Sequence, residues 1–216
     1  NSVRHPKETA HDNICMTQHL LEVAKEAAVT KFLFPSTASL YAKNPTPWKE
    51  DMPLEPIEPY SWQKLSCEQL CRMYAKMYGL PAVALRFFKV FGEYQRADTA
   101  LAAFIKAKSE GRPVTLTRTT AQSSFSWGRR DFVYAGDVAE AIYLALEKDT
   151  GAYDVFNVAS GKVRTMEEVA NALGVETEWI EKRGYEVDEH WADVSKIKKV
   201  LGWEAKTDVL DWLKRK

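Results

Sequence analysis

Residues 31–70 read KFLFPSTASLYAKNPTPWKEDMPLEPIEPYSWQKLSCEQL, and the order of their features predicts the fold around them. The first six residues form a short apolar run that ends in a turn signal, which is typical of a buried β-strand. A proline-rich loop follows. From about Tyr60 to Tyr78, apolar residues recur at helical spacing, and Gly79 with Pro81 ends that helix.

The flanking segments extend this strand and helix into a layered sheet. A helix over residues 13–28, capped by Asp12 or Asn13, precedes the strand, and a second apolar run, AVALRFFKV over 82–90, follows the long helix. Apolar strands joined by a helical crossover pair in parallel and are covered on both faces. The predicted fold class is therefore α/β.

The remaining elements are shorter. We expect a helix over 98–110, an exposed strand in PVTLTRTT, a loop in AQSSFSWGRR, and a strand followed by a helix capped by Asp137 in DFVYAGDVAEAIYLALEK. A strand in DVFNVAS and a helix in TMEEVANALG follow, the latter with a capping box from Thr165 to Glu168 and a stop at Gly174. Two short helices, in ADVSKIKKVLGW and TDVLDWLKR, close the chain.

Composition excludes several classes of function. The 216 residues, 45% hydrophobic, are enough for one domain or two closely joined lobes. Thirty basic and thirty acidic side chains cancel, so no global field favours nucleic acid or an anionic membrane. No run of eighteen apolar residues occurs, and the first residues form no hydrophobic signal region. We expect a soluble protein with neither nucleic acid nor membrane as partner.

The three cysteines do not predict a metal site. Cys15, Cys67 and Cys71 make no even disulfide framework, and Cys67 and Cys71 lie four apart on one predicted helix. Packing on a helix face is the more common reason for that spacing. We therefore expect no metal and a reducing, cytoplasmic location.

Tyr60 and Lys64 suggest chemistry, since residues four apart on a helix share one face. A free phenol has a pKa near 10, and its use as a base near neutrality requires a fall of roughly 3 units, or about 4 kcal/mol. A neighbouring ammonium has the right sign, and a hydroxyl from Thr37 or Ser36 could donate to the same substrate oxygen. The pattern favours a proton-handling site at an alcohol or ketone carbon. By itself the pair is also common by chance.

Six blocks carry a family resemblance that extends from Asn1 to Lys216. They are NICMTQHLLEVAKEAAVTKFLFPSTASLY, PYSWQK, LRFFKVFG, RRDFVYAGDVAEA, FNVASG and HWADVSKIKKVLGW. In this order they resemble the extended short-chain dehydrogenase/reductase family, specifically nucleotide-sugar epimerases and dehydratases similar to UDP-glucose 4-epimerase. The resemblance implies a Rossmann-like parallel sheet over 1–92, to which 131–160 partly returns, and a smaller α+β substrate lobe mainly over 93–216.

The resemblance also implies roles for the residues near the strand and the long helix. Tyr60 would be the catalytic base and acid, and Thr37 a third catalytic hydroxyl. Lys64 would bind the nicotinamide ribose of NAD and lower the pKa of the phenol. Asn13 and Ser36 would lie in the cofactor site. NADP is not excluded as the cofactor.

The implied substrate is a nucleotide-diphosphate sugar. Arg130 and Arg183 match positions of arginines that clamp the diphosphate, which suits the bidentate geometry of guanidinium. Lys89 stands where the family usually has asparagine, and His190 would bound the space beside the hexose. The resemblance further implies a homodimer through the helices over 13–28 and 60–78.

The expected reaction is NAD-dependent epimerisation through transient oxidation at sugar C4. Ala38 and Ser39 follow Thr37 where dehydratases of the family usually carry an acidic pair, which disfavours a dehydratase. The alternatives are a reductase, a decarboxylase-like member, or a cofactor-free binding or assembly protein of the same fold. The ten glycines include no two that are three residues apart, so the glycine-rich pyrophosphate turn of this family is absent. We expect the chain to be the latter part of a longer enzyme.

Overall fold

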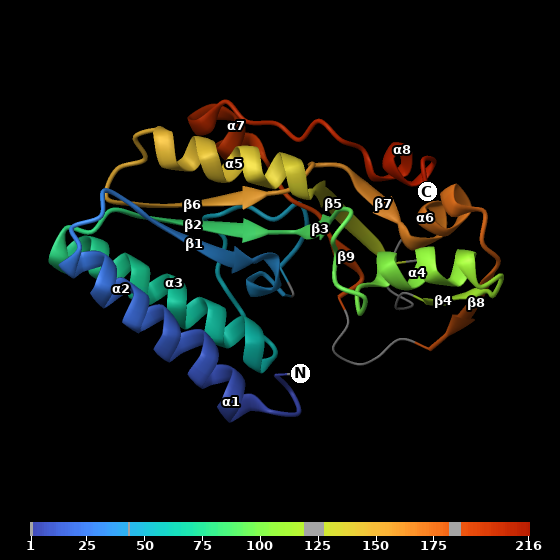
Figure 1. The fold of residues 1–216 in the computed structure, drawn as a ribbon, viewed down its shortest axis with the longest axis horizontal. Coiled ribbons are helices and arrows are strands. Elements are labelled where there is room, and N and C mark those ends of the chain that lie inside the picture. Colours follow the sequence, from blue (N-terminus) through green and yellow to red (C-terminus); the bar gives the residue numbers. More distant parts are fainter. Residues whose placement is uncertain (1, 43, 119–127, 182–186) are drawn as a thin grey trace.

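A computed structural model describes residues 2–42, 44–118, 128–181 and 187–216 of the chain. Its first lobe is built on three parallel strands in the order β1 (Phe32–Thr37), β2 (Ala82–Phe87) and β6 (Tyr153–Val158). Thr37 lies opposite Phe87, which lies opposite Val158, so the three carboxyl ends meet at one edge (Figure 1). The predicted parallel α/β arrangement is confirmed.

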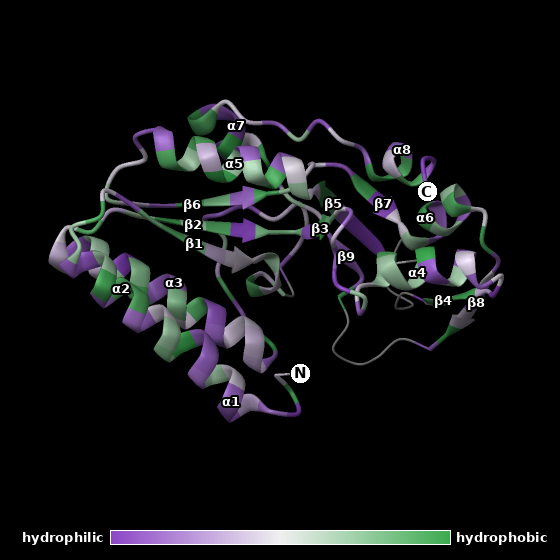
Figure 2. Ribbon diagram, viewed as in Figure 1, coloured by the Kyte–Doolittle hydropathy of each residue, from purple (hydrophilic) through white to green (hydrophobic). Residues whose placement is uncertain are grey.

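Helices cover both faces of this sheet. The helices α2 (Met16–Glu26) and α3 (Pro59–Tyr78) lie on one face, and α5 (Ala135–Glu147) and α7 (Ser195–Leu201) lie on the other (Figure 1). Alternate residues of β2 serve the two cores: Ala82 and Ala84 pack with Cys67 and Cys71 of α3, and Val83 and Leu85 pack with residues of α5 and α7. The strands are accordingly mostly hydrophobic (Figure 2).

The second lobe mixes parallel and antiparallel pairs. β5 (Arg129–Tyr134) pairs in parallel with β3 (Lys89–Phe91) and β9 (Glu189–His190), and antiparallel with β7 (Val163–Thr165). A two-stranded sheet joins β4 (Val114–Thr117) to β8 (Thr177–Ile180). The helices α4 (Ala100–Ser109), α6 (Met166–Leu173) and α8 (Val209–Leu213) pack with these strands around a core that includes Phe91, Phe104, Phe132 and Trp212.

Local signals explain the ends of the helices that matter for the site. The Glu58 side chain accepts hydrogen bonds from the backbone N–H groups of Tyr60 (2.8 Å) and Ser61 (2.6 Å), and Pro59 starts α3. Gly79 ends that helix with φ +67°. The capping box of α6, from Thr165 to Glu168, and its stop at Gly174 are confirmed.

Three expectations about element ends were wrong. The first helical segment begins at Pro6, as α1 (Pro6–Ala10), and runs through a π-helical turn, η1 (His11–Cys15), into α2, so neither Asp12 nor Asn13 is an N-cap. Proline is well suited to the first helical position. The N-cap of α5 is Tyr134, and buried Asp137 instead accepts hydrogen bonds from the backbone N–H groups of residues 206 (3.0 Å) and 207 (2.9 Å).

Two further segments differ from the prediction, and a third lies mostly outside the described residues. The run over 82–90 divides into β2 and β3, and β4 is not an exposed strand, because Val114 and Leu116 are buried in the second core. Most of the loop expected in AQSSFSWGRR lies outside the described residues, and its last two residues begin β5. Among the described residues, no helix has the length and apolar character needed to span a membrane.

Two glycines with the same backbone conformation provide a matched test of packing in the second lobe. Gly161 (φ +73°) and Gly174 (φ +69°) are both left-handed, but only at Gly161 would an added Cβ meet a neighbour, 2.9 Å from Cγ2 of Val194. We expect Gly174→Ala to lower the free energy of unfolding by about 1 kcal/mol. Gly161→Ala should cost about 3 kcal/mol, because a stiff β-branched side chain must also move. Urea denaturation of both variants measures the difference, and equal losses would contradict the packing argument.

Candidate functional site

Helix α3 places Tyr60 and Lys64 against the carboxyl end of β1. The Nζ of Lys64 donates a hydrogen bond to the carbonyl oxygen of Pro35 (3.0 Å). The same ammonium lies 4.8 Å from the ring centroid of Phe34 and 5.8 Å from that of Tyr60. The structure thus brings together the tyrosine, the lysine and the strand end that the sequence placed in one site.

Thr37 completes this cluster. Its side chain is near enough to that of Tyr60 to favour the phenolate form. Its Oγ1 accepts a hydrogen bond from the backbone N–H of Ser39 (3.2 Å), which caps the short 3₁₀ turn η2 (Ala38–Leu40). The tyrosine ring keeps 36% of its surface exposed. The Tyr60–Thr37 pair therefore borders solvent, where a ligand can reach it.

The electrostatics of this cluster differ from the expectation. Burial raises the pKa of Tyr60 above its ordinary value, and the side chain of Thr37 acts in the opposite direction without cancelling that rise. Burial also lowers the pKa of Lys64. The main effects on the pKa of Tyr60 come from groups other than Lys64, and the expected lowering of this pKa by Lys64 stays a prediction. The phenol is fully protonated near neutrality, and its use as a base needs a further positive charge beside it.

Asn13 and Ser36 use their side chains within the protein. Nδ2 of Asn13, in the π-helical turn, donates to Oε1 of Gln63 (2.8 Å), one turn along α3 from Tyr60. The Ser36 hydroxyl is buried and donates to the carboxylate of Glu68 (2.5 Å). These contacts give both residues a structural part, and their predicted part in cofactor binding stays a prediction.

A second cluster gathers three basic side chains on adjacent strands. Arg130 on β5 lies opposite His190 on β9. Lys89 is on β3, which also pairs with β5. Burial, and then Arg130, lower the pKa of Lys89 to about 8. Burial, Arg130 and Lys89 lower the pKa of His190 well below its usual range. Lys89 and Arg130 are thus two positive charges held close together beside a neutral His190, an arrangement that an anion would stabilise.

Neighbouring groups hold this cluster in place. The Arg130 guanidinium donates through Nη1 to the carbonyl oxygens of Arg129 (2.8 Å) and Asp188 (2.9 Å). The His190 ring lies beside that of Trp48, with centroids 5.1 Å apart. The structure therefore brings together Lys89, Arg130 and His190, and their predicted part in substrate binding stays a prediction. Arg183, the fourth, lies outside the described residues.

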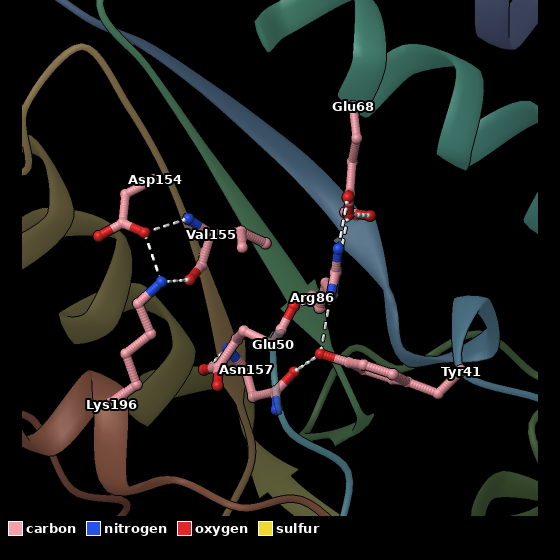
Figure 3. Close-up of polar contacts among 9 residues, drawn as sticks. Tyr41, Glu50, Glu68, Arg86, Asp154, Val155, Asn157 and Lys196 are labelled. Atoms are coloured by element: carbon pink, nitrogen blue, oxygen red, sulfur yellow. Dashed lines mark hydrogen bonds and ion pairs between the residues drawn. The ribbon is translucent and has the colours of Figure 1, made fainter. Parts of the chain in front are cut away.

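The sequence prediction missed a buried polar network between the two clusters. Arg86 of β2 forms a bidentate pair with Glu68 of α3 and also donates to the hydroxyl of Tyr41, which donates to Asn157 of β6 (Figure 3). Two signals could have found it. Glu68 follows Lys64 by four residues on the same helix face, and Arg86 is a charged residue inside an otherwise apolar strand.

Comparison with known proteins identifies the family. The profile of the NAD dependent epimerase/dehydratase family matches residues 1–159. An uncharacterized UDP-glucose epimerase, YtcB of Bacillus subtilis, is 33% identical over 94% of this chain and 65% of its own length. A UDP-glucuronate 4-epimerase of Thermodesulfobacterium geofontis is 32% identical over 99% of this chain and 66% of its length. The chain thus spans about two thirds of the length of these relatives.

Solved structures agree in fold. A UDP-glucose 4-epimerase of Thermotoga maritima, solved with UDP-glucose, has a TM-score of 0.86 at 32% identity and covers 99% of this chain and 70% of that one. A UDP-N-acetylglucosamine 4-epimerase of Methanobrevibacter ruminantium, solved with UDP-N-acetylmuramic acid, has a TM-score of 0.89 at 28% identity. Both are Rossmann-fold enzymes, as the parallel sheet of this chain predicts. The chain belongs to the NAD dependent epimerase/dehydratase family.

Proposed function

We propose that the protein containing this chain is an NAD-dependent 4-epimerase of nucleotide sugars. The observation that carries the proposal is the meeting of Thr37, Tyr60 and Lys64 at the carboxyl end of β1, where open α/β sheets bind their ligands. Relatives whose names or titles specify UDP-sugar 4-epimerases support the choice of reaction.

The residues present fit one end of NAD. A phenol and an ammonium on one helix face offer the hydrogen-bonding groups that a ribose diol and a carboxamide-bearing ring require, and Asn13 lies one helix away. The glycine-rich turn that holds the pyrophosphate is absent from these 216 residues. When bound, NAD supplies the acceptor and then the donor of the hydride at the sugar carbon.

Within this chain, Tyr60 carries the proton. Its phenolate takes the proton of the sugar 4-hydroxyl as the carbonyl forms, and the phenol so formed returns that proton when the ketone is reduced on the other face, so no net proton is consumed. Thr37 holds the same sugar oxygen by a hydrogen bond. Because burial raises the pKa of Tyr60, proton abstraction depends on positive charge next to the phenol.

The basic cluster accounts for the nucleotide end of the substrate. The charges that act on Lys89 and His190 are positive, and a diphosphate would supply the opposite charge. The guanidinium of Arg130 and the ammonium of Lys89 can donate hydrogen bonds to its phosphate oxygens. We assign Arg183 to the same clamp from its sequence position alone. Ala38 is buried and Ser39 binds Thr37, so no carboxyl group stands where a dehydratase would need one to eliminate water.

The helices α2 and α3 support a homodimer. Each carries exposed apolar side chains at helical spacing, which is typical of a helix face that packs against another protein surface. These side chains are Met16, Leu20 and Val23 on α2 and Trp62, Met73 and Met77 on α3. We propose that these faces pair two copies of the protein. We also propose a cytoplasmic location, since all three cysteines are free thiols.

The catalytic proposal predicts the behaviour of Tyr60→Phe in the intact protein. Removal of the hydroxyl should lower kcat for UDP-glucose or UDP-glucuronate epimerisation by about 10²–10⁴-fold, because general acid–base catalysis is lost. Calorimetric titration should find NAD still bound, since Lys64 remains. Tyr94→Phe, at a fully exposed tyrosine, is the matched control and should retain activity. Retained epimerisation in Tyr60→Phe would refute the assigned role.

Lys89 predicts a pH dependence of nucleotide binding. Its ammonium is charged below a pKa of about 8, so its contribution to UDP affinity is present near neutrality and is lost as the pH rises through that value. Affinity measured by calorimetry should fall by up to about tenfold between about pH 7 and about pH 9. Lys89→Arg stays charged across this range and controls for titration of the ligand. A similar fall in both proteins would show that Lys89 does not contact the anion.

The dimer prediction is tested with charge on the exposed helix face. Val23→Glu should give a monomer by light scattering at micromolar concentration, because the association would bury two like charges close together. Leu146→Glu, at an exposed leucine of α5, should leave the mass unchanged. A monodisperse wild-type monomer would exclude this interface.

A further inference from the structure

A buried ion pair joins α3 to the sheet. Nε and Nη2 of Arg86 donate to the two carboxylate oxygens of Glu68 at 3.0 Å and 2.8 Å. The two side chains are only 4% and 2% exposed. The hydroxyl of Ser36 donates to the same carboxylate at 2.5 Å. Glu68 is thus held by one residue of β2 and one of β1.

This pair continues a series of contacts along one face of α3. Tyr60, Lys64 and Glu68 are spaced by four residues, so they lie on successive turns of that face. Two of them bind the carboxyl half of β1, Lys64 at the carbonyl of Pro35 and Glu68 at Ser36, and Tyr60 lies near Thr37. Polar contacts therefore specify how the helix is placed along the strand.

The apolar contacts alone do not specify it as sharply. On this face of the sheet, β2 presents the small Ala82 and Ala84 to Cys67 and Cys71 of α3, and the larger apolar contacts come from other elements, such as Phe34 of β1. Small side chains leave shallow ridges, and apolar contact is non-directional. A buried ion pair also gives little net stability compared with well-packed apolar residues. Its bidentate geometry does restrict the helix to one placement.

The network also reaches the basic cluster. Nη1 of Arg86 donates to the Tyr41 hydroxyl (2.8 Å), which donates to Oδ1 of Asn157 (2.7 Å) (Figure 3). Nδ2 of Asn157 donates to the carbonyl of Trp48 (2.9 Å), whose ring lies against His190. The same arginine thus connects the helix that carries Tyr60 with the loop that supports the predicted substrate cluster.

We propose that Glu68 and Arg86 are positioning residues, which fix α3 on β1 so that Tyr60 and Lys64 meet Thr37. Neither side chain borders the predicted ligand site, since both are buried. They act through the placement of the helix. The kinetic consequence of this proposal rests on the proposed epimerase function, whereas its structural consequence does not.

The kinetic test uses Glu68→Gln and Arg86→Lys in the intact protein. Glu68→Gln keeps the length of the side chain but removes its charge, whereas Arg86→Lys keeps the charge but is shorter and lacks the fork. A shift of about 1 Å in the helix should lower kcat by about 100-fold in both variants. In Glu68→Gln, KM should change by less than about threefold, because Arg86 keeps its contact with Tyr41 and so its connection to the basic cluster. Loss of activity that merely follows the fall in melting temperature would overturn the proposal.

Lys196 offers a matched control. Its Nζ forms an ion pair with Asp154 (2.5 Å) and donates to the carbonyl of Val155 (2.9 Å), and both partners are on β6 (Figure 3). Lys196→Met removes an ion pair next to the same sheet without touching α3. It should change the melting temperature but leave kcat within about twofold. A fall in kcat equal to that of Glu68→Gln would show that any lost ion pair has this effect.

Crystal structures of the variants separate this proposal from the proposed function. In Glu68→Gln and Arg86→Lys, the 3.0 Å contact between Lys64 Nζ and the Pro35 carbonyl should be lost, and in Lys196→Met it should remain. If the wild type shows no epimerisation, the proposed function fails, and this distance still decides the positioning role. An unchanged contact in Glu68→Gln would overturn that role. So would a Glu68→Gln protein that does not fold, because the pair would then be a requirement for folding.

Discussion

The placement of α3 along β1 is the constraint on which the candidate site depends. Neighbouring residues of an α-helix differ by about 1.5 Å of rise and about 100° of rotation. A slip of one residue would therefore carry Lys64 away from the Pro35 carbonyl and turn Tyr60 away from Thr37. The bidentate pair between Arg86 and Glu68 restricts α3 to one placement on the sheet. A buried charge pair adds little net stability, so we infer that its contribution here is this restriction.

The sequence predicted those parts of the fold that depend on local signals. Signals between residues that are close in sequence determine the apolar runs of β1 and β2, the long helix α3 and the capping box at Thr165. The start of the first helical segment was missed because periodicity over 13–28 concealed the earlier signal at Pro6. The role of Asp137 was missed because its hydrogen-bond donors lie about seventy residues away in the chain.

The candidate site was likewise predictable only where its residues are close together in the sequence. Tyr60 and Lys64 share a helix, so their spacing alone placed them together. The proximity of Arg130 and His190 follows from the pairing of β5 with β9, which no local pattern encodes, and it was reached through family resemblance. Glu68 resembles any polar residue on a helix until its partner Arg86 is known. A charge within an apolar strand, such as Arg86, is the signal to search for such a partner.

The two clusters also depend on the ligand for their charge. Burial raises the pKa of Tyr60 and lowers the pKa of Lys89 to about 8, so in both groups it disfavours the charged form that the proposed reaction needs. An anion beside Lys89 raises its pKa, and a cation beside Tyr60 lowers its pKa. Nucleotide and cofactor would thus each create the charge state that binds it. In the proposed reaction, the phenol therefore depends on a positive charge beside it to act as a base.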